Sequence, residues 1–163
     1  MRGTDWAVTL ASFNAADTED AMAVMLSCCA SRRFAAGVVA GRPYPSFAAV
    51  QEAIAAAFES LDWADILEAL AGHPRIGARV SGQSAAEQSG VADSSREALL
   101  AGNLEYEERF GHVFLICATG LSGEEMLAAL RERLANDPFT ERKVATAELR
   151  KITVLRVRKA LGS

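Results

Sequence analysis

The chain has 163 residues, of which half are apolar and 23% are charged, and its formal net charge is -4. A chain of this size and composition folds into a compact core, so we expect one domain over residues 1–163 and exclude an intrinsically disordered protein. No block of Lys or Arg interrupts the mildly acidic sequence, and aromatic residues are few. These features exclude nucleic acid as an expected partner.

The cysteines and the amino terminus indicate the compartment. Cys28, Cys29 and Cys117 are odd in number and contain no Cys-x-x-Cys pair, so we expect them to be reduced and buried. Residues 1–14 lack a basic region followed by an apolar core, and the apolar run 21–30 is too short to span a bilayer. We therefore expect a cytoplasmic protein with no membrane partner.

Two helices are predicted in the first part of the chain. Asp17 or Thr18 is a suitable N-cap for a helix whose apolar residues are Met22, Met25, Leu26 and Cys29. Ser46 is a suitable N-cap for a second helix. Its apolar residues recur every three or four positions, at Phe47, Val50, Ile54, Phe58 and Leu61.

Three further helices are predicted after residue 90. One runs from about Ser94 to Glu108. The next begins at Ser122, which forms a capping-box pattern with Glu125 and precedes an apolar stripe of Leu127, Leu130 and Leu134. The last begins at Asp137-Pro138 and carries Leu149, Ile152 and Arg156 along one face. The chain is therefore predicted to be all-α, a single compact multi-helix domain with irregular Gly/Pro loops.

Two stretches dense in Gly and Pro, residues 37–45 and 72–82, are predicted loops. Residues 112–119 contain a continuous apolar run without clear helical spacing, so their conformation is open between extended and helical.

The second predicted loop holds His73, one of two histidines in the chain. Pro74 and the flanking glycines hold its imidazole on a stiff turn, where a group that titrates near neutral pH can transfer protons. A surface or helix-ending histidine is the alternative. His112, at the entrance to the apolar run, is expected to be structural, and Cys117 is not expected to act as a nucleophile.

Two further side chains each have a structural and a functional interpretation. Glu87 closes a capping box with Ser84, but the same helix amino terminus offers amides to an anionic or carbonyl-rich ligand. Arg156 lies on the apolar stripe of the last predicted helix. Its structural interpretation is an ion pair, and its functional interpretation is a substrate carboxylate bound by two hydrogen bonds from the planar guanidinium. The sequence contains no recognisable metal-binding motif.

The motifs taken together resemble the OHCU decarboxylase family, the 2-oxo-4-hydroxy-4-carboxy-5-ureidoimidazoline decarboxylases of purine breakdown. They occur in the family's order over nearly the whole chain: His73-Pro74-Arg75-Ile76-Gly77, Ser84-Ala85-Ala86-Glu87-Gln88, Tyr106 with Arg109-Phe110-Gly111, Phe114-Leu115-Ile116-Cys117-Ala118, and Lys151-Ile152 with Arg156.

This resemblance implies an all-helical enzyme, commonly a homodimer, that needs no cofactor and converts OHCU into (S)-allantoin and CO2. It implies that His73 is the catalytic histidine and Glu87 its acidic partner. The substrate-binding residues that it implies are Pro74, Ser84, Ala85, Ala86, Gln88, Phe114, Leu115, Ile116, Cys117, Ala118 and Arg156.

Two departures from the family are visible. His112-Val113 stand where some relatives have another aromatic residue and a proline, and the chain does not end in the peroxisomal tripeptide of some eukaryotic members. A non-catalytic helical interaction module and a decarboxylase acting on a related ureido ring acid are the alternative functions.

Overall fold

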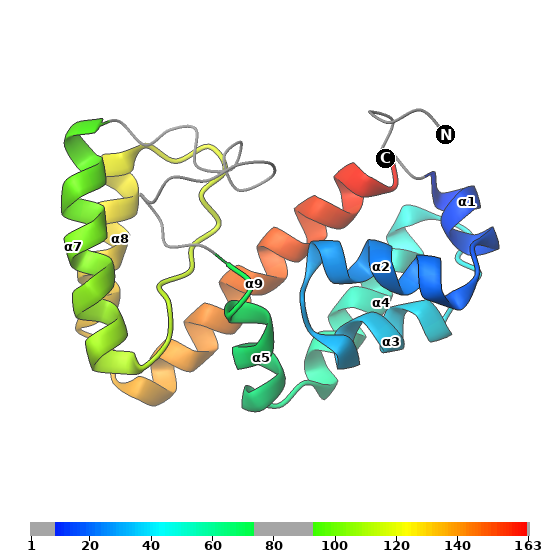
Figure 1. The fold of residues 1–163 in the computed structure, drawn as a ribbon, viewed down its shortest axis with the longest axis horizontal. Coiled ribbons are helices and arrows are strands. Elements are labelled where there is room, and N and C mark those ends of the chain that lie inside the picture. Colours follow the sequence, from blue (N-terminus) through cyan, green and yellow to red (C-terminus); the bar gives the residue numbers. More distant parts are fainter. Residues whose placement is uncertain (1–8, 74–92, 163) are drawn as a thin grey trace. The chain divides into compact units, whose positions relative to one another are not determined.

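The computed structural model describes residues 9–73 and 93–162. These residues form eight helices and no strand, so the predicted all-α class is confirmed (Figure 1). The helices are α1 (Leu10–Ala15), α2 (Thr18–Cys28), α3 (Arg32–Ala40), α4 (Phe47–Ser60), α5 (Trp63–Leu70), α7 (Asp93–Phe110), α8 (Gly123–Leu134) and α9 (Pro138–Ala160).

The described helices group into two compact units. Unit 1 contains α1 to α4, α5 up to Ala69, and the last part of α9 from Arg150. Unit 2 contains α7, α8 and α9 up to Leu149. The long helix α9 therefore contributes residues to both units. That residues 1–163 form one domain stays a prediction.

In unit 1, α3 packs against both α2 and α4 (Figure 1). The predicted caps are confirmed: the Asp17 side chain accepts a hydrogen bond from the Asp20 N–H, and the Ser46 side chain accepts one from the Ala49 N–H. A third cap, Ser31, begins α3 and is itself buried. At each of these helix starts a side-chain oxygen accepts a hydrogen bond from an amide that would otherwise be unpaired, so the helix begins directly after the capping residue.

The predicted loop 37–45 is wrong over its first four residues, since α3 continues to Ala40. The reason is the apolar face of the helix: Phe34 before Gly37 and Val38 after it are both buried, four residues apart, so the helical spacing continues through the glycine. The helices α1, α3 and α5 were not among those predicted from the sequence.

In unit 2, α7 packs against α8 around a buried cluster (Figure 1). The predicted capping box is confirmed, because the Ser122 side chain accepts from the Glu125 N–H and Glu125 accepts from the Ser122 N–H. Asp137 accepts from the Thr140 N–H at 2.9 Å just before α9 begins at Pro138, also as predicted. The buried cluster consists of Leu99, Tyr106, Phe114, Ile116, Ala118, Met126 and Leu130.

Residues 113–118, within the connection between α7 and α8, form neither helix nor strand, so the helical alternative for this run is excluded. The three cysteines are free thiols: Cys28 and Cys29 are buried as predicted, whereas Cys117 is only half-buried. Within residues 9–73 and 93–162, no helix has the length and apolar character needed to cross a membrane.

Candidate active site

His73 lies three residues after Leu70, the last residue of α5. Its backbone N–H donates to the Leu70 carbonyl at 3.0 Å, and the residue is half-buried. This position at the end of a helix fits the structural interpretation of His73 and also puts it at the start of the predicted catalytic loop. Pro74 and residues 84–88, Glu87 included, lie outside the described residues, so their roles stay predictions.

The apolar run Phe114 to Ala118, predicted to bind substrate, lies mostly in the interior of unit 2. Phe114, Leu115, Ile116 and Ala118 are buried, and Cys117 is half-buried. A segment without helix or strand has no regular partners for its backbone groups, and buried polar groups need partners.

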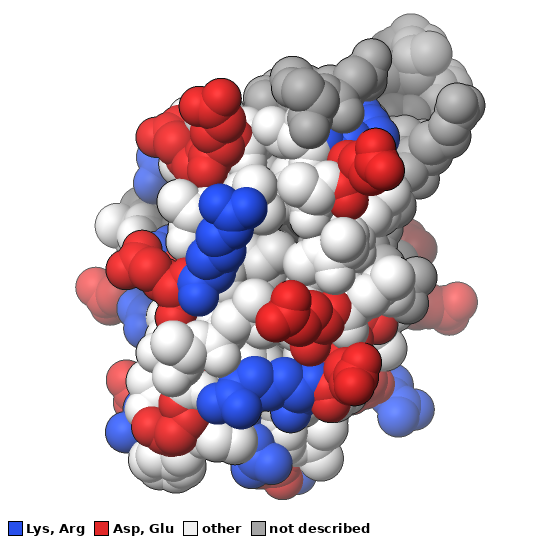
Figure 2. Space-filling model, turned by 90° about the vertical axis from the view of Figure 1, so that its left-hand side faces the viewer, with Lys and Arg blue, Asp and Glu red and all other residues white. Residues whose placement is uncertain are grey.

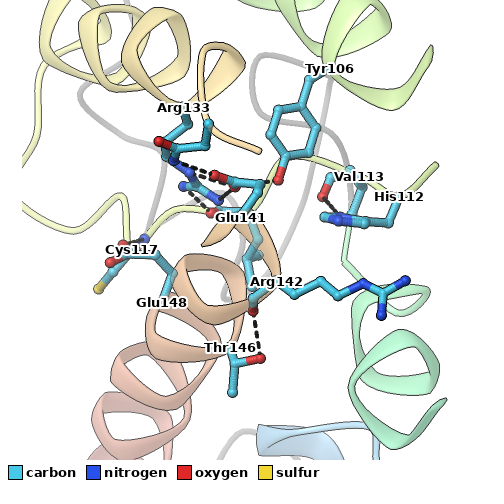
Figure 3. Close-up of polar contacts among 11 residues, drawn as sticks. Tyr106, His112, Val113, Cys117, Arg133, Glu141, Arg142, Thr146 and Glu148 are labelled. Carbon is cyan, nitrogen blue, oxygen red and sulfur yellow. Dashed lines mark hydrogen bonds and ion pairs between the residues drawn. The ribbon is translucent and has the colours of Figure 1, made fainter. Parts of the chain in front are cut away.

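Side chains from two helices supply these partners. Arg133 of α8 donates from Nη1 to the Leu115 carbonyl at 2.7 Å, and Glu148 of α9 accepts the Cys117 N–H at 2.8 Å through Oε1. Figure 3 shows Glu141 and Glu148 projecting from α9, with Glu148 beside Cys117 and Glu141 beside Arg133. The segment is therefore anchored at two backbone positions by charged side chains.

Arg133 belongs to a buried ionic centre that the sequence analysis did not find. The residue is 7% exposed, and its Nε and Nη2 donate to Oε2 of the fully buried Glu141 at 2.8 and 2.6 Å. The Tyr106 hydroxyl also donates to Oε2, and Asn136 donates to Oε1 at 3.0 Å. The guanidinium lies over the Phe114 ring, 4.5 Å from its centroid. The only sequence signal was the three-residue spacing of Arg133 from Leu130 on the apolar face of α8.

Burial controls the protonation of the aromatic residues in this centre. Burial, reinforced by the hydrogen bond to Glu141, raises the pKa of Tyr106, so the phenol stays protonated and acts as a donor. Burial lowers the pKa of His112, whose ring meets Tyr106 edge-on at 5.4 Å. The His112 Nδ1 lies 3.1 Å from the Val113 carbonyl, which can only accept, so Nδ1 carries the proton. These contacts agree with the structural role predicted for His112.

Arg156 lies on the part of α9 that belongs to unit 1, where it is half-buried. Burial raises the pKa of the Cys28 thiol to about 11 and also raises that of Cys29, while the positive charge of Arg156 opposes both shifts. Both thiols are therefore protonated at neutral pH and do not act as nucleophiles. His73 and residues 114–118 belong to unit 2, so the convergence of Arg156 with them stays a prediction.

Charge and metal ligands constrain the chemistry further. Figure 2 shows acidic and basic side chains interspersed on the face that it presents, with no extended area of one sign among the described residues there. Among residues 9–73 and 93–162, no group of three or more His, Cys, Asp or Glu side chains is arranged to hold a metal ion.

Comparison with known proteins identifies the family to which this chain is similar. A sequence profile described as OHCU decarboxylase matches residues 14–158. The chain is 38% identical over 145 residues to the uric acid degradation bifunctional protein TTL of Arabidopsis thaliana, covering 81% of this chain and 44% of that protein. It is 34% identical over 136 residues to the 2-oxo-4-hydroxy-4-carboxy-5-ureidoimidazoline decarboxylase of Amia calva, covering 76% of this chain and 77% of that protein.

A solved structure is similar over most of the chain. The crystal structure of an OHCU decarboxylase in the presence of (S)-allantoin superposes with a TM-score of 0.77 at 32% identity, covering 91% of this chain and 100% of that one. The chain spans less than half the length of the Arabidopsis protein but the full length of this crystallised chain.

Proposed function

The chain belongs to the OHCU decarboxylase family, and from this premise we propose that it decarboxylates 2-oxo-4-hydroxy-4-carboxy-5-ureidoimidazoline to (S)-allantoin and CO2 in urate breakdown. The observation that carries the proposal is the match over residues 14–158, which includes residues of both compact units and every candidate site residue. The similarity to an OHCU decarboxylase crystallised with (S)-allantoin supports the same substrate class.

The substrate itself supplies the electron sink for this reaction. When the bond between the ring carbon and its carboxylate breaks, CO2 leaves and the electron pair forms a double bond to the neighbouring ring carbon. The electrons of the ring C=N bond then move to its nitrogen, which takes up a proton. The hydroxyl on the same carbon loses its proton as the enol-like intermediate becomes a carbonyl. Protonation of the neighbouring ring carbon on one face then gives the (S) product. The proposal therefore assigns no step to a metal or a cofactor.

The residues have distinct roles in this proposal. His73 handles the proton of the substrate hydroxyl, and Glu87 sets the tautomer and charge of its imidazole. Arg156 holds the substrate carboxylate through its planar fork, while the amides of residues 84–88 hold ureido or ring carbonyls. The 114–118 segment forms the wall against which the ring lies.

The direct test replaces His73 with Ala or Asn and supplies freshly generated substrate. We expect both variants to lose accelerated, stereoselective allantoin formation, followed by circular dichroism of the product, while their far-UV helical signal is unchanged. The other histidine is the matched control: His112→Asn should keep turnover because His112 is proposed to be structural. Near-wild-type turnover in the His73 variants would refute the catalytic role.

A second substitution tests the carboxylate site. Arg156→Lys keeps the charge but loses the bidentate fork, so we expect a raised KM for the substrate. An unchanged KM would assign Arg156 a structural role beside Cys28 and Cys29.

The proposal also includes a homodimer, which the family resemblance implies, and the cytoplasmic location predicted from the cysteines and the amino-terminal sequence. Size-exclusion chromatography with light scattering should give twice the mass of the chain. A monomer at the concentrations used for turnover would remove the dimer from the proposal.

A further inference from the structure

We propose that Glu148 is a positioning residue of this decarboxylase: its carboxylate fixes the backbone of the 114–118 segment through the Cys117 N–H and so sets where the segment meets the substrate. The anchoring follows from the contacts in unit 2, whereas its effect on substrate rests on the proposed function.

The segment has two anchors that come from different helices. Glu148 of α9 accepts the Cys117 N–H at 2.8 Å, and Arg133 of α8 donates to the Leu115 carbonyl at 2.7 Å. Residues 113–118 have no helix or strand of their own, so these two side chains supply hydrogen-bond partners that a neighbouring strand would supply in a sheet. A hydrogen bond with a carboxylate acceptor is also stronger than a neutral one.

The two anchored positions are two residues apart. The Leu115 carbonyl is bound to Arg133 of α8, and the Cys117 N–H is bound to Glu148 of α9, so the backbone is held on both sides of Ile116. Loss of the Glu148 anchor therefore frees one end of this short stretch.

Glu148 differs from its neighbour on the same face of α9. Glu141 lies two helical turns earlier and acts on the segment indirectly through Arg133, inside a fully buried ionic centre. Glu148 acts directly and is only half-buried. Replacing Glu148 is therefore expected to shift the segment while the fold remains, whereas replacing Glu141 perturbs the core.

The test compares Glu148→Ala with Glu148→Gln, whose amide oxygen can accept the same N–H. For Glu148→Ala we expect KM for the substrate to rise about tenfold, the effect of one lost hydrogen bond, with kcat within about twofold. Glu148→Gln should stay within about threefold of wild type. The matched control is Glu132→Ala, which removes an exposed carboxylate of α8 and should leave both constants unchanged.

A second measurement reports on the anchor without substrate. Release of the segment should increase the alkylation rate of the half-buried Cys117 in Glu148→Ala, while the buried Cys28 and Cys29 keep their wild-type rates. An unchanged Cys117 rate would overturn the anchoring.

The kinetic outcomes separate the positioning role from the proposed function. Unchanged KM in Glu148→Ala, or a defect in Glu148→Gln as large as that in Glu148→Ala, would overturn the positioning role while the decarboxylase activity stands. If the wild-type chain itself fails to convert the substrate, the proposed function fails and the positioning role fails with it.

Discussion

Removing Arg133 should strongly destabilise the protein, because it would leave a buried anion without its counter-charge. The Glu141 carboxylate is fully buried, and Arg133 contributes two of its hydrogen bonds, at 2.8 and 2.6 Å. In Arg133→Ala, the Tyr106 hydroxyl and Asn136 remain as donors, but both are neutral. The Leu115 carbonyl loses its donor as well.

The expected magnitude follows from this geometry. Breaking a buried ion pair by removing one partner costs about 3–5 kcal/mol, out of a total free energy of unfolding of about 5–15 kcal/mol for a typical domain. For a chain of this length, that loss lowers the melting temperature by roughly 6–20 °C. The contacts share atoms, so their separate contributions are not summed.

Urea unfolding followed by far-UV circular dichroism measures the effect. The matched control is Arg131→Ala, which removes an exposed arginine from the same helix and should change stability by about 0.5 kcal/mol or less. The double variant Arg133→Met with Glu141→Leu leaves no uncompensated charge and should be less destabilised than Arg133→Ala alone. If Arg133→Ala loses no more stability than Arg131→Ala, the buried ionic centre is not what holds unit 2 together.

Three further predictions concern packing, pH and thiol reactivity. A Cβ atom on Gly102 would overlap the Cδ2 of the buried Leu130, so Gly102→Ala should destabilise the wild type by about 1–3 kcal/mol. In a Leu130→Ala background the same substitution should stabilise the fold by up to about 1 kcal/mol. The same sign in both backgrounds in urea unfolding would refute the clash. Because burial lowers the pKa of His112, its neutral form stabilises the fold above the unfolded pKa of about 6.5, and stability should fall as the pH drops from there toward the folded pKa. His112→Asn should weaken that dependence between about pH 7.5 and about pH 5.5, and an unchanged slope would argue against it. In the native wild type, iodoacetamide should label the half-buried Cys117 before the buried Cys28, because burial raises the pKa of the Cys28 thiol to about 11. Mass spectrometry gives the order of labelling, and labelling of Cys28 first would contradict the burial assignment.

The helices whose starts carry a local signal could be predicted from the sequence. Ser46 and Ser122 cap α4 and α8 as predicted, because an N-cap and the apolar spacing behind it are both encoded within one or two turns. The prediction was wrong at Gly37, which lies inside α3 before the buried Val38 and Val39. A glycine inside a helix has the same local appearance as one that ends a helix.

The conformation of residues 113–118 could not be predicted because the partners of this segment are distant in the sequence. The segment is held by Arg133 and Glu148, which lie 18 and 31 residues from the backbone groups that they bind. No periodicity within the segment encodes these partners. The candidate site residues came from family motifs, and the Arg133–Glu141 centre that supports the segment was missed because neither residue belongs to those motifs.

The central claim is that this chain converts OHCU stereoselectively into (S)-allantoin. The most direct measurement follows freshly generated substrate by circular dichroism, with and without the purified chain. The account predicts that the (S)-allantoin signal forms faster than in the uncatalysed reaction and that its initial rate is proportional to the protein concentration. Racemic allantoin formed at the uncatalysed rate would contradict it.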